Sequence, residues 1–484
     1  MSSLFFVALM LTRPLVINIL LKFFNNVFFS LHFWAFWQIL ELIQRRFDLM
    51  PILQDLSVSL FELVSKEKFV FCSWEPASLD STTLAKLFIK LTIKCMDGRV
   101  YNLNINASNA LLFQKILQKI NDTKTIAWIG FNWKDVFTFF QRVTGQRLIL
   151  KGIVDLAWFE SYLRLETTES DYRGQLSLFK QILKNQQIWG LYKQVYEPLI
   201  SNSIPSMESY GLVNDNIGQV VFPNYHIEGQ ENGRLSCSCN FKRCYNPHSL
   251  GEDEKVNLLL KDDSYKFLSF DYRNMEVTVL ANLANDDILL DIIKNKNTFV
   301  YETIFEMITN VKNHEQARII GKKMFLPCIY GQGEAGLANS LDISREQASI
   351  YIQKLHTTFK KSFEFVESQQ KKAHETNEVV DFFGRKRKLK KEDSYKARNF
   401  SVQSPAAMLC LEALNNLQSE SNQIYKIVFH VHDGYCIAAH DKHLQEAYLL
   451  AKKTLVQKSK FMDIELSVSS KVGKNLNKMV SIGK

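Results

Sequence analysis

The sequence predicts a multidomain fold in which an α/β domain precedes a larger α+β domain. Its 484 residues exceed the roughly 250–300 at which a single hydrophobic core usually stops growing. Residues 68–160 alternate short β-rich runs with helical patterns, an order typical of α/β domains. From residue 233 onward, strand and long helix patterns mix without this alternation.

The α/β part shows a separate pattern for each expected strand and helix. Residues 69–72 and 125–129 are short apolar runs that predict buried strands. Residues 107–120 have the apolar spacing of an amphipathic helix. Residues 175–200 turn helical, and we expect this helical stretch to end at Pro198, because proline interrupts helices.

The N-terminal segment differs in composition from the rest. Its first 40 residues contain no Asp or Glu and are dense in aromatic and aliphatic residues. Its apolar stretch is marginal against the roughly 20 residues of a spanning helix, and it lacks the small-residue cleavage site of a secretory signal. Three interpretations of this segment stay open: a membrane anchor, a docking extension, or residues upstream of the true start. We favour the last of these and consider membrane contact less favoured. The changes of composition predict four segments: 1–49, 50–174, 175–232 and 233–484.

The net charge of +9 is compatible with a polyanionic partner but does not require one. The basic residues are concentrated from Arg385 to Lys391, where six of seven residues are Lys or Arg. Such a run is a solvated loop or a phosphate-binding segment.

The eight cysteines have no regular spacing, which argues against a disulfide scaffold. Cys237, Cys239, Cys244 and His248 lie close together in the sequence, and three thiols with one imidazole could hold zinc. Their spacing fits no common zinc module, so we do not favour a zinc site.

Two Asp residues lie beside apolar runs that predict strands. Asp271 ends one such run and precedes a helical pattern, a place where Asp is usually only a helix cap. Asp433 and Gly434 lie between two strongly apolar runs, where Asp-Gly is a strong hairpin-turn signal. A simple turn accounts for Gly434, but not for an acid beside His432 at the tip of a buried hairpin.

A third pattern supplies positive charge. Arg318, Lys322, Leu326 and Tyr330 follow one another at intervals of four, which places them on one helical face. Two cations, an apolar side chain and an aromatic ring along a face match the phosphates, sugar and base of a nucleoside triphosphate. Each of the three patterns alone is only suggestive.

Together, the patterns predict a site for nucleotidyl transfer. Carboxylates from two strands, Asp271 and Asp433, can hold two Mg²⁺ ions, which prefer oxygen ligands and phosphate co-ligands. Arg318 and Lys322 would then position the triphosphate and neutralise its charge.

From residue 233 onward the chain resembles family-A DNA polymerases of the bacterial polymerase I type. Residues 271–276, Asp-Tyr-Arg-Asn-Met-Glu, resemble motif A; Arg318 to Gly331 resembles motif B; and His432-Asp433-Gly434 resembles motif C. Residues 233–238, 383–387 and 399–403 resemble three further segments of the family that lie near DNA. The order and rough spacing of all six segments agree with the family. This resemblance also offers a better explanation of the cysteine cluster than zinc does.

The resemblance implies a polymerase right hand, with a palm sheet, helical fingers and a reduced thumb, and it assigns roles to individual residues. Asp271, Asp433 and the Tyr272 carbonyl would bind metal. Arg318 and Lys322 would grip the triphosphate, Leu326 and Tyr330 would lie beside the sugar and base, and Glu276 would exclude the ribose 2′-hydroxyl. The residues expected to contact DNA are Arg234, Asn399, Gln403, His432, Arg385, Lys386 and Arg387.

The sequence departs from the family pattern at three positions near these motifs. Gly434 replaces the usual Glu of motif C, which we expect to weaken metal binding without abolishing activity. Leu326 replaces the usual Phe or Tyr, which should alter discrimination at the sugar. Pro327 lies inside the fingers helix, where we expect a bend.

Two larger departures concern whole domains. Only residues 201–232 separate the Pro-Leu-Ile segment at 198–200 from the Gly-Arg-Leu-Ser segment, too few for the family's helical thumb, so synthesis should be distributive unless a partner replaces it. Residues 68–165 resemble an RNase-H-like 3′→5′ exonuclease domain with a degraded carboxylate set. Ser73-Trp74-Glu75 replaces Asp-x-Glu, and residues 130–135, which end in Asp135, resemble the second motif only faintly. Asp155 lies at a familiar later place, and 163–185 has no convincing Tyr-x3-Asp of the third motif. We expect no proofreading.

The resemblance implies a monomeric enzyme that adds dNTPs to a primer on template DNA, in a cytoplasmic or nucleoid setting. Two alternatives stay open. One is a single-subunit RNA polymerase, against which Glu276 argues; the other is a catalytically inactive DNA-binding or scaffold protein, against which Asp271, Asp433 and Lys322 argue.

Overall fold

The computed structural model describes residues 69–483 except 77–87, 96–98, 124–125, 164–178, 240–242, 296–298, 313–314 and 422. Residues 67–484 form one compact unit, and the predicted extension at 1–49 lies outside the described residues. No helix in the described part of the chain combines the length and apolar character needed to cross a bilayer.

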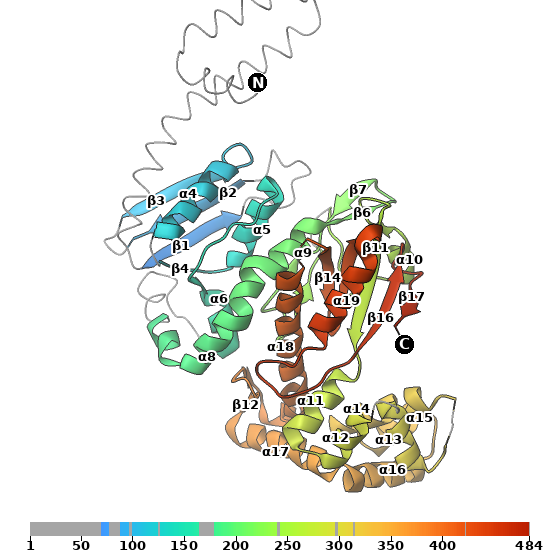
Figure 1. The fold of residues 1–484 in the computed structure, drawn as a ribbon. Helices are drawn as coiled ribbons and strands as arrows, with labels where there is room; N and C mark the ends of the chain where they lie inside the picture. The colour runs from blue at the N-terminus through green and yellow to red at the C-terminus, as the bar shows by residue number, and fades with distance from the viewer. Residues whose placement is uncertain are drawn as a thin grey trace, which may run out of the picture. The chain divides into compact units, whose positions relative to one another are not determined.

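The first described domain is a five-stranded sheet flanked by helices (Figure 1). The strand order is β3-β2-β1-β4-β5; β1 pairs antiparallel with β2 and parallel with β4. This mixed arrangement confirms the predicted RNase-H-like α/β domain. The predicted strands and helix are found, with shifted ends. The bounds are β1 (Phe69–Pro76), β2 (Phe88–Lys94), β3 (Val100–Asn106), α4 (Ala110–Thr123), β4 (Ala127–Gly130), α5 (Trp133–Thr144), β5 (Ile153–Asp155) and α6 (Leu156–Leu163).

A continuous helical stretch leads out of this domain, and the expectation that it ends at Pro198 is wrong. Helix α8 (Gln186–Leu191) continues through two π-helical segments, η2 (Tyr192–Tyr196) and η3 (Leu199–Ser203), into α9 (Ile204–Tyr210). Pro198 directly precedes η3, where the wider π turn accommodates a residue that cannot donate a backbone hydrogen bond.

The region predicted as a reduced thumb contains the end of this helix and short strands. β6 (Leu212–Asn214) pairs with β7 (Gln219–Val221) and with β10 (Leu258–Leu259), which follows α10 (Glu252–Val256). β8 (Tyr225–His226) pairs with β9 (Ser236–Cys237). The short hairpin formed by β8 and β9 brackets the Gly-Arg-Leu segment at 233–235.

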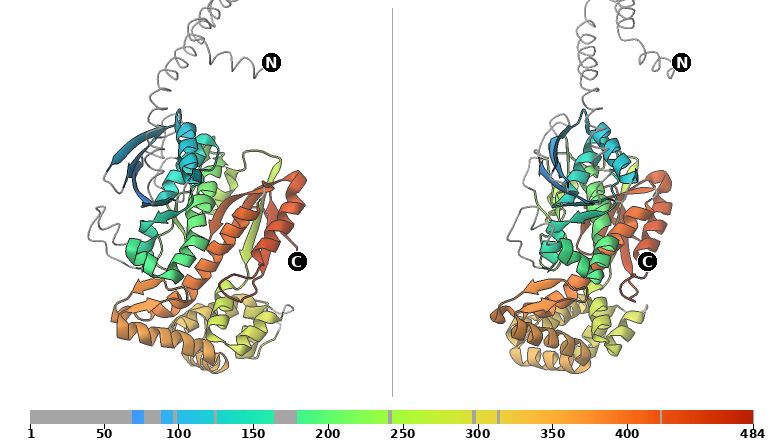
Figure 2. Two further views of the ribbon diagram at one scale, coloured as in Figure 1. Left: turned by 60° about the vertical axis from the view of Figure 1, so that its left-hand side comes forward. Right: turned by 90° about the vertical axis from the view of Figure 1, so that its left-hand side faces the viewer.

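A second five-stranded sheet carries the predicted acidic residues. Its order is β14-β15-β11-β16-β17, with antiparallel pairing throughout. The long helix α18 packs against η3, α11 and α19, and it runs beside the sheet in two views (Figure 2). The bounds are β11 (Tyr265–Tyr272), α11 (Met275–Ala284), α18 (Lys396–Glu420), β14 (Tyr425–Val431), β15 (Gly434–His440), η5 (Asp441–His443), α19 (Leu444–Leu455), β16 (Val468–Gly473) and β17 (Val480–Ile482).

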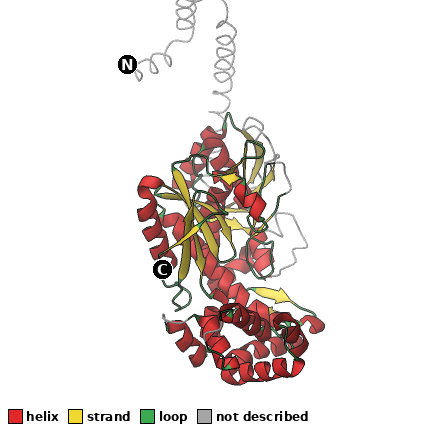
Figure 3. Cartoon of the chain, turned by 90° about the vertical axis from the view of Figure 1, so that its right-hand side faces the viewer, coloured by secondary structure: helices red, strands yellow, loops and turns green. Residues whose placement is uncertain are grey.

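Helices inserted between β11 and α18 form a separate lobe below the strands (Figure 3). In this lobe α13 packs closely on α14, because Gly321 in α14 has no Cβ to collide with the Tyr301 carbonyl. A palm-like sheet with a helical fingers lobe confirms the predicted right-hand arrangement. The bounds are α12 (Asp287–Lys294), α13 (Val300–Thr309), α14 (Ala317–Ile329), α15 (Glu334–Leu341), α16 (Arg345–Thr358), α17 (Lys360–Thr376), β12 (Glu378–Val380), β13 (Lys386–Lys388) and η4 (Lys391–Asp393).

The considered zinc cluster has another arrangement. Cys239 and Cys244 are joined by a disulfide, so their sulfurs are not available as zinc ligands. The Cys237 thiol instead lies near the carbonyl oxygens of Ser238 and Tyr245. This disulfide joins cysteines only five positions apart, so it does not cross-link distant parts of the chain. It is therefore compatible with the expectation that the chain is not a disulfide scaffold.

Candidate active site

The strand pairing brings the two predicted acidic positions together. Asp271 lies near the end of β11, directly opposite Gly434 at the start of β15. Asp433 lies in the turn between β14 and β15, and its carbonyl accepts a hydrogen bond of 3.1 Å from the Tyr272 amide. His432 precedes it with a left-handed φ of 55°, which turns the chain sharply at the hairpin tip.

Both carboxylates line one cleft of about 560 Å³ between the sheet and the fingers lobe. Burial, followed by repulsion from Asp433, raises the pKa of Asp271 to about 6, although Lys322, Lys471 and Arg318 oppose the rise. An acid whose pKa is raised by a second acid marks a place where a bound cation would relieve repulsion. Within residues 69–483, apart from the gaps above, no group of three or more His, Cys, Asp or Glu side chains could hold a metal ion.

Helix α14 supplies the opposite wall of the cleft. Arg318, Lys322 and Leu326 all line it, as expected from their spacing of four. Pro327 lies only two residues before α14 ends at Ile329, so it marks the helix terminus and the bend expected there stays a prediction. Tyr330, one residue past the helix, lines a neighbouring groove instead.

Glu276, in the first turn of α11, is the acceptor for three side chains. Arg234 Nη2 donates to Oε1 at 2.7 Å, the Tyr330 hydroxyl donates to Oε2 at 2.5 Å, and Gln403 Nε2 donates to Oε1 at 3.2 Å. Burial, followed by the Glu276 charge, raises the pKa of Tyr330 well above its usual value, so the hydroxyl stays a donor. The network fixes the Glu276 carboxylate at the boundary between cleft and groove.

The other predicted metal ligand and primer contact lie near the hairpin. The Tyr272 side chain points into the palm core, where its hydroxyl donates to the Leu455 carbonyl at 2.8 Å, and the residue also lines the cleft. The His432 ring lies 5.1 Å from the His248 ring, and burial, followed by the positive charge of Arg234, lowers the pKa of His432. Burial, followed by repulsion from His432, lowers the pKa of His248 to about 4, so the His248 ring is neutral at physiological pH.

The groove beside the cleft is lined by three of the seven residues predicted to contact DNA. Asn399, Gln403 and Arg387 line it together with Tyr330. Arg387 also forms an ion pair with Glu231 and lies over the Phe400 ring. Lys386 is directed elsewhere and pairs with Glu378 across β12 and β13 at 3.4 Å.

Arg385 contradicts the expectation that it meets DNA phosphates. It is only 3% exposed, and its guanidinium lies 4.6 Å above the centre of the Tyr162 ring in α6. Its amide donates to Asp381 at 2.8 Å. The basic run is thus divided: its first residue is buried against the α/β domain, which sequence spacing could not show.

Sequence reasoning missed a row of polar residues on the floor of the cleft. Ser269 in β11 lies opposite Lys471 in β16, which lies opposite Ser481 in β17, and all three line the cleft. Ser469 lies opposite Asp271 in the same way. Ser469 and Lys471 alternate along β16, which indicates that their side chains share one face of the sheet. Only the order of the strands shows that this face is the floor of the cleft.

The exonuclease-like domain uses its remaining acids structurally. Asp155 is 2% exposed and accepts hydrogen bonds from the amides of Asn132 and Trp133 at the start of α5. Burial, followed by the charge of Glu228, raises the pKa of Asp155 to about 7. Asp135 forms an ion pair of 2.9 Å with Lys134. Most of the region expected to lack a third motif, 164–178, lies outside the described residues.

A palm sheet with a carboxylate pair at its strand ends, facing a basic helix of a fingers lobe, defines the right-hand class of polymerases. The model of DNA polymerase family A matches residues 166–478. Because the match covers more than half of the chain, the chain belongs to DNA polymerase family A, a family of DNA-directed DNA polymerases that use divalent metal ions.

Bacterial DNA polymerase I proteins are among its relatives. The protein of Pseudomonas aeruginosa is 25% identical over 282 residues, which are 54% of this chain and 30% of the relative. That of Lactococcus lactis subsp. lactis is 27% identical over 236 residues, covering 44% of this chain and 25% of the relative. The chain thus spans less than a third of the length of these relatives.

A solved structure has a similar fold. It is the POL domain of Pol1 from M. smegmatis, in a complex with DNA primer-template and dNTP. The TM-score is 0.70 at 14% identity, and the match covers 87% of this chain and 98% of that chain. At this identity the likeness shows the fold.

Proposed function

We propose that this chain is a template-directed DNA polymerase that adds dNTPs to a primer 3′-hydroxyl by two-metal nucleotidyl transfer. The observation that carries the proposal is the convergence of Asp271, Asp433, Arg318 and Lys322 on one cleft. The primer-template and dNTP in the similar solved POL domain support these as ligands of this chain as well.

The site suits divalent cations. Asp271 and Asp433 supply the anionic oxygens that Mg²⁺ prefers, with the Tyr272 carbonyl as a further ligand. Burial, followed by repulsion from Asp433, raises the pKa of Asp271, and a bound cation would relieve that repulsion. Two bound Mg²⁺ ions would supply Lewis acidity to the attacking hydroxyl and to the leaving pyrophosphate. Gly434 adds no carboxylate, so we expect the metal affinity to be modest.

The protein's own groups position the reactants. Arg318 and Lys322 neutralise the triphosphate from the fingers, while Leu326 faces the sugar and Glu276 occupies the space that a 2′-hydroxyl would need. Arg234, His432, Asn399, Gln403, Lys386, Arg387 and Tyr330 are assigned to the primer, the template and the nascent pair.

The decisive experiment is primer extension with Mg²⁺ varied, comparing wild type with Asp433→Ala. We expect extension by wild type and none by the variant, with primer-template binding retained. Incorporation of rNTPs in preference to dNTPs would favour an RNA polymerase. Equal extension by wild type and Asp433→Ala would contradict the assignment of this site. DNA binding without any extension by wild type would contradict the polymerase proposal and favour a scaffold role.

We also propose that the enzyme lacks proofreading and acts distributively as a monomer. Asp155 and Asp135 are engaged by backbone amides and by Lys134, which supports a structural role for the α/β domain. The short strands at 212–226 support the absence of a full thumb. Removal of a mismatched 3′ nucleotide, or long products from single binding events without a partner protein, would overturn these two points.

A further inference from the structure

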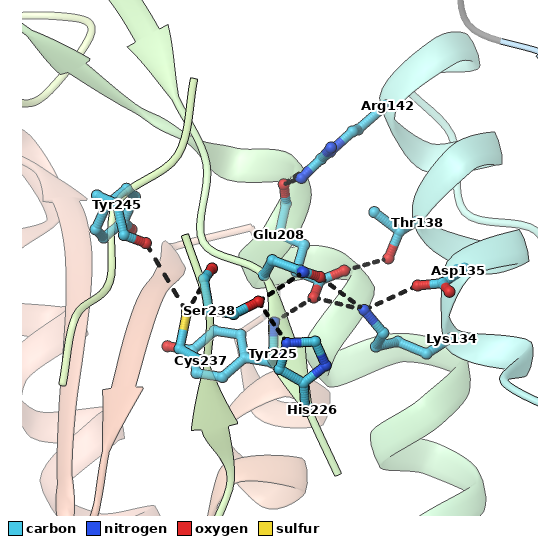
Figure 4. A network of polar contacts seen from close by, with 11 residues as sticks. Lys134, Asp135, Thr138, Arg142, Glu208, Tyr225, His226, Cys237, Ser238 and Tyr245 are labelled. Carbon is cyan, nitrogen blue, oxygen red and sulfur yellow. Dashed lines mark hydrogen bonds and ion pairs between the residues drawn. The ribbon is translucent and has the colours of Figure 1, made fainter. Parts of the chain in front are cut away.

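A buried ionic cluster joins the exonuclease-like domain to the polymerase part (Figure 4). Lys134 Nζ in α5 lies 2.9 Å from Glu208 Oε1 in α9 and 2.9 Å from Asp135 Oδ1. The Thr138 hydroxyl donates to Glu208 Oε2 at 2.7 Å. Glu208 is only 1% exposed and Lys134 8%, so these charges depend on each other rather than on water. We call Lys134, Thr138 and Glu208 the clasp.

Two further contacts tie α5 to the same place. Arg142 donates through Nε and Nη2 to the Glu208 carbonyl, at 2.9 and 2.7 Å. Lys134 Nζ also reaches Asn224 Oδ1 at 3.3 Å, directly before β8. The clasp therefore holds both the end of the long helix and the hairpin that brackets the Gly-Arg-Leu segment.

From the clasp, one residue leads to the catalytic hairpin. Glu208 Oε1 accepts the Tyr225 amide at 2.7 Å. At the other end of the same residue, the Tyr225 hydroxyl accepts from the His430 amide and donates to the His430 carbonyl, both at 3.0 Å. β14 is an edge strand among the described residues, so no described strand pairs with these backbone groups of His430, and the one Tyr225 hydroxyl bonds to both.

The His430 side chain extends this connection to the turn. Its Nδ1 lies 3.0 Å from the Gly434 carbonyl oxygen, so Nδ1 must carry the proton and donate. Burial, followed by repulsion from His248, lowers the pKa of His430 to about 3, which keeps the ring neutral in this tautomer. The Asp433 turn lies between the two bonded residues, His430 and Gly434.

We propose that Lys134 and Glu208 are positioning residues, and that the degenerate exonuclease-like domain holds the Asp433 hairpin in place through Tyr225. The remnant of an exonuclease motif thus serves the polymerase site. The proposal rests on the proposed function for its kinetic consequence, but its structural part does not. A buried carboxylate that loses its lysine disturbs its surroundings strongly, so the clasp acts as a unit.

The test combines kinetics with hydrogen exchange on the full chain. Lys134→Met breaks the clasp, and Tyr225→Phe removes only the hydroxyl at the far end of the connection. Thr138→Val is a milder clasp variant for use if Lys134→Met does not fold. Leu117→Ala, in the core of α4, is the control that weakens the same domain without touching the clasp.

The clasp and Tyr225 variants should lower kcat by about ten- to a hundredfold, as expected for a misplaced catalytic group, with KM for dNTP and primer-template affinity changed less than about threefold. The kcat of the double variant Lys134→Met/Tyr225→Phe should be little lower than that of the worse single variant, because both substitutions act through one connection. The clasp variants and Tyr225→Phe should each speed amide hydrogen exchange in residues 425–440, including His430, while the β16 amides keep their wild-type exchange rates. Leu117→Ala should do neither.

Wild-type exchange at 425–440 in Lys134→Met or Thr138→Val would overturn the proposal. Losses of kcat that multiply in the double variant, or equal effects of Leu117→Ala on the hairpin, would also overturn it. The exchange measurements need no activity, so they decide the structural proposal even if the wild-type chain extends no primer.

Discussion

Replacing Tyr330 with Phe tests whether hydrogen bonds hold Glu276 in the place from which we propose that it rejects ribonucleotides. The Glu276 carboxylate accepts from Arg234 at 2.7 Å and from the Tyr330 hydroxyl at 2.5 Å. Each hydrogen bond to a charged group contributes about 1.5–3 kcal/mol. A 2′-hydroxyl that displaced the carboxylate would break both, at a cost of about 3–6 kcal/mol, or roughly 10²- to 10⁴-fold in kcat/KM.

The assay is single-nucleotide incorporation, with kcat/KM measured for dCTP and for rCTP opposite template dG. Tyr330→Phe removes one of these two short bonds and leaves those from Arg234 and Gln403, so the dCTP preference should fall by about 10- to 150-fold. Glu276→Ala should abolish most of the preference. Tyr395→Phe is the matched control, because this tyrosine lines the same groove but is 50% exposed. A wild-type preference in Tyr330→Phe, together with its loss in Glu276→Ala, would refute the role of the hydrogen bond.

Three further predictions concern charge. Lys471→Gln should raise KM for dNTP by about three- to tenfold in steady-state kinetics, because a cation is lost from the cleft floor, whereas Lys474→Gln, outside the cleft, should not. The pKa of Asp155 in the folded protein, about 7, exceeds its value in the unfolded chain, so its contribution to stability is lost as the pH rises from about 4 to 7. Asp155→Asn should therefore reduce the fall in Tm between pH 5 and pH 8. An unchanged fall in Tm would contradict the raised pKa of Asp155. Arg385→Ala should lower the free energy of unfolding by about 2 kcal/mol or more in urea titrations, with DNA affinity at fixed salt unchanged; weaker DNA binding would instead support a phosphate contact.

The sequence was sufficient for the fold and for the centre of the candidate site. Asp271 lies near the end of an apolar strand and Asp433 in the turn between two apolar strands, and the spacing of Arg318, Lys322 and Leu326 directs them to one helical face, so local patterns determine the cleft. Family resemblance added the relation between these segments, which periodicity alone does not supply.

What the sequence could not show depends on contacts between distant residues. Arg385 belongs to a run that is basic throughout, and only the neighbouring Tyr162 and Asp381 explain why it is buried. Glu208 has no local sign of a partner, since Lys134 lies 74 positions earlier. Pro198 was expected to end a helix, because proline interrupts ordinary helices. The expectation failed because a π turn beside Pro198 depends on packing in the surrounding core, which local propensity does not show.

The π-helical segments have a consequence for how one helix serves two neighbours. Each wide turn advances the angular position of the following side chains relative to an ordinary helix, so successive stretches present different sides. The Tyr192 ring lies 5.1 Å from the Trp158 ring of the α/β domain, whereas the Ser203 hydroxyl donates to Asn415 in α18. Asn415 in turn donates to the Val195 carbonyl at 2.6 Å. One continuous helical stretch can therefore pack against the α/β domain on one side and against α18 on another. Inserting or deleting one residue within 192–203 would rotate one of these two sets of contacts away from its partner.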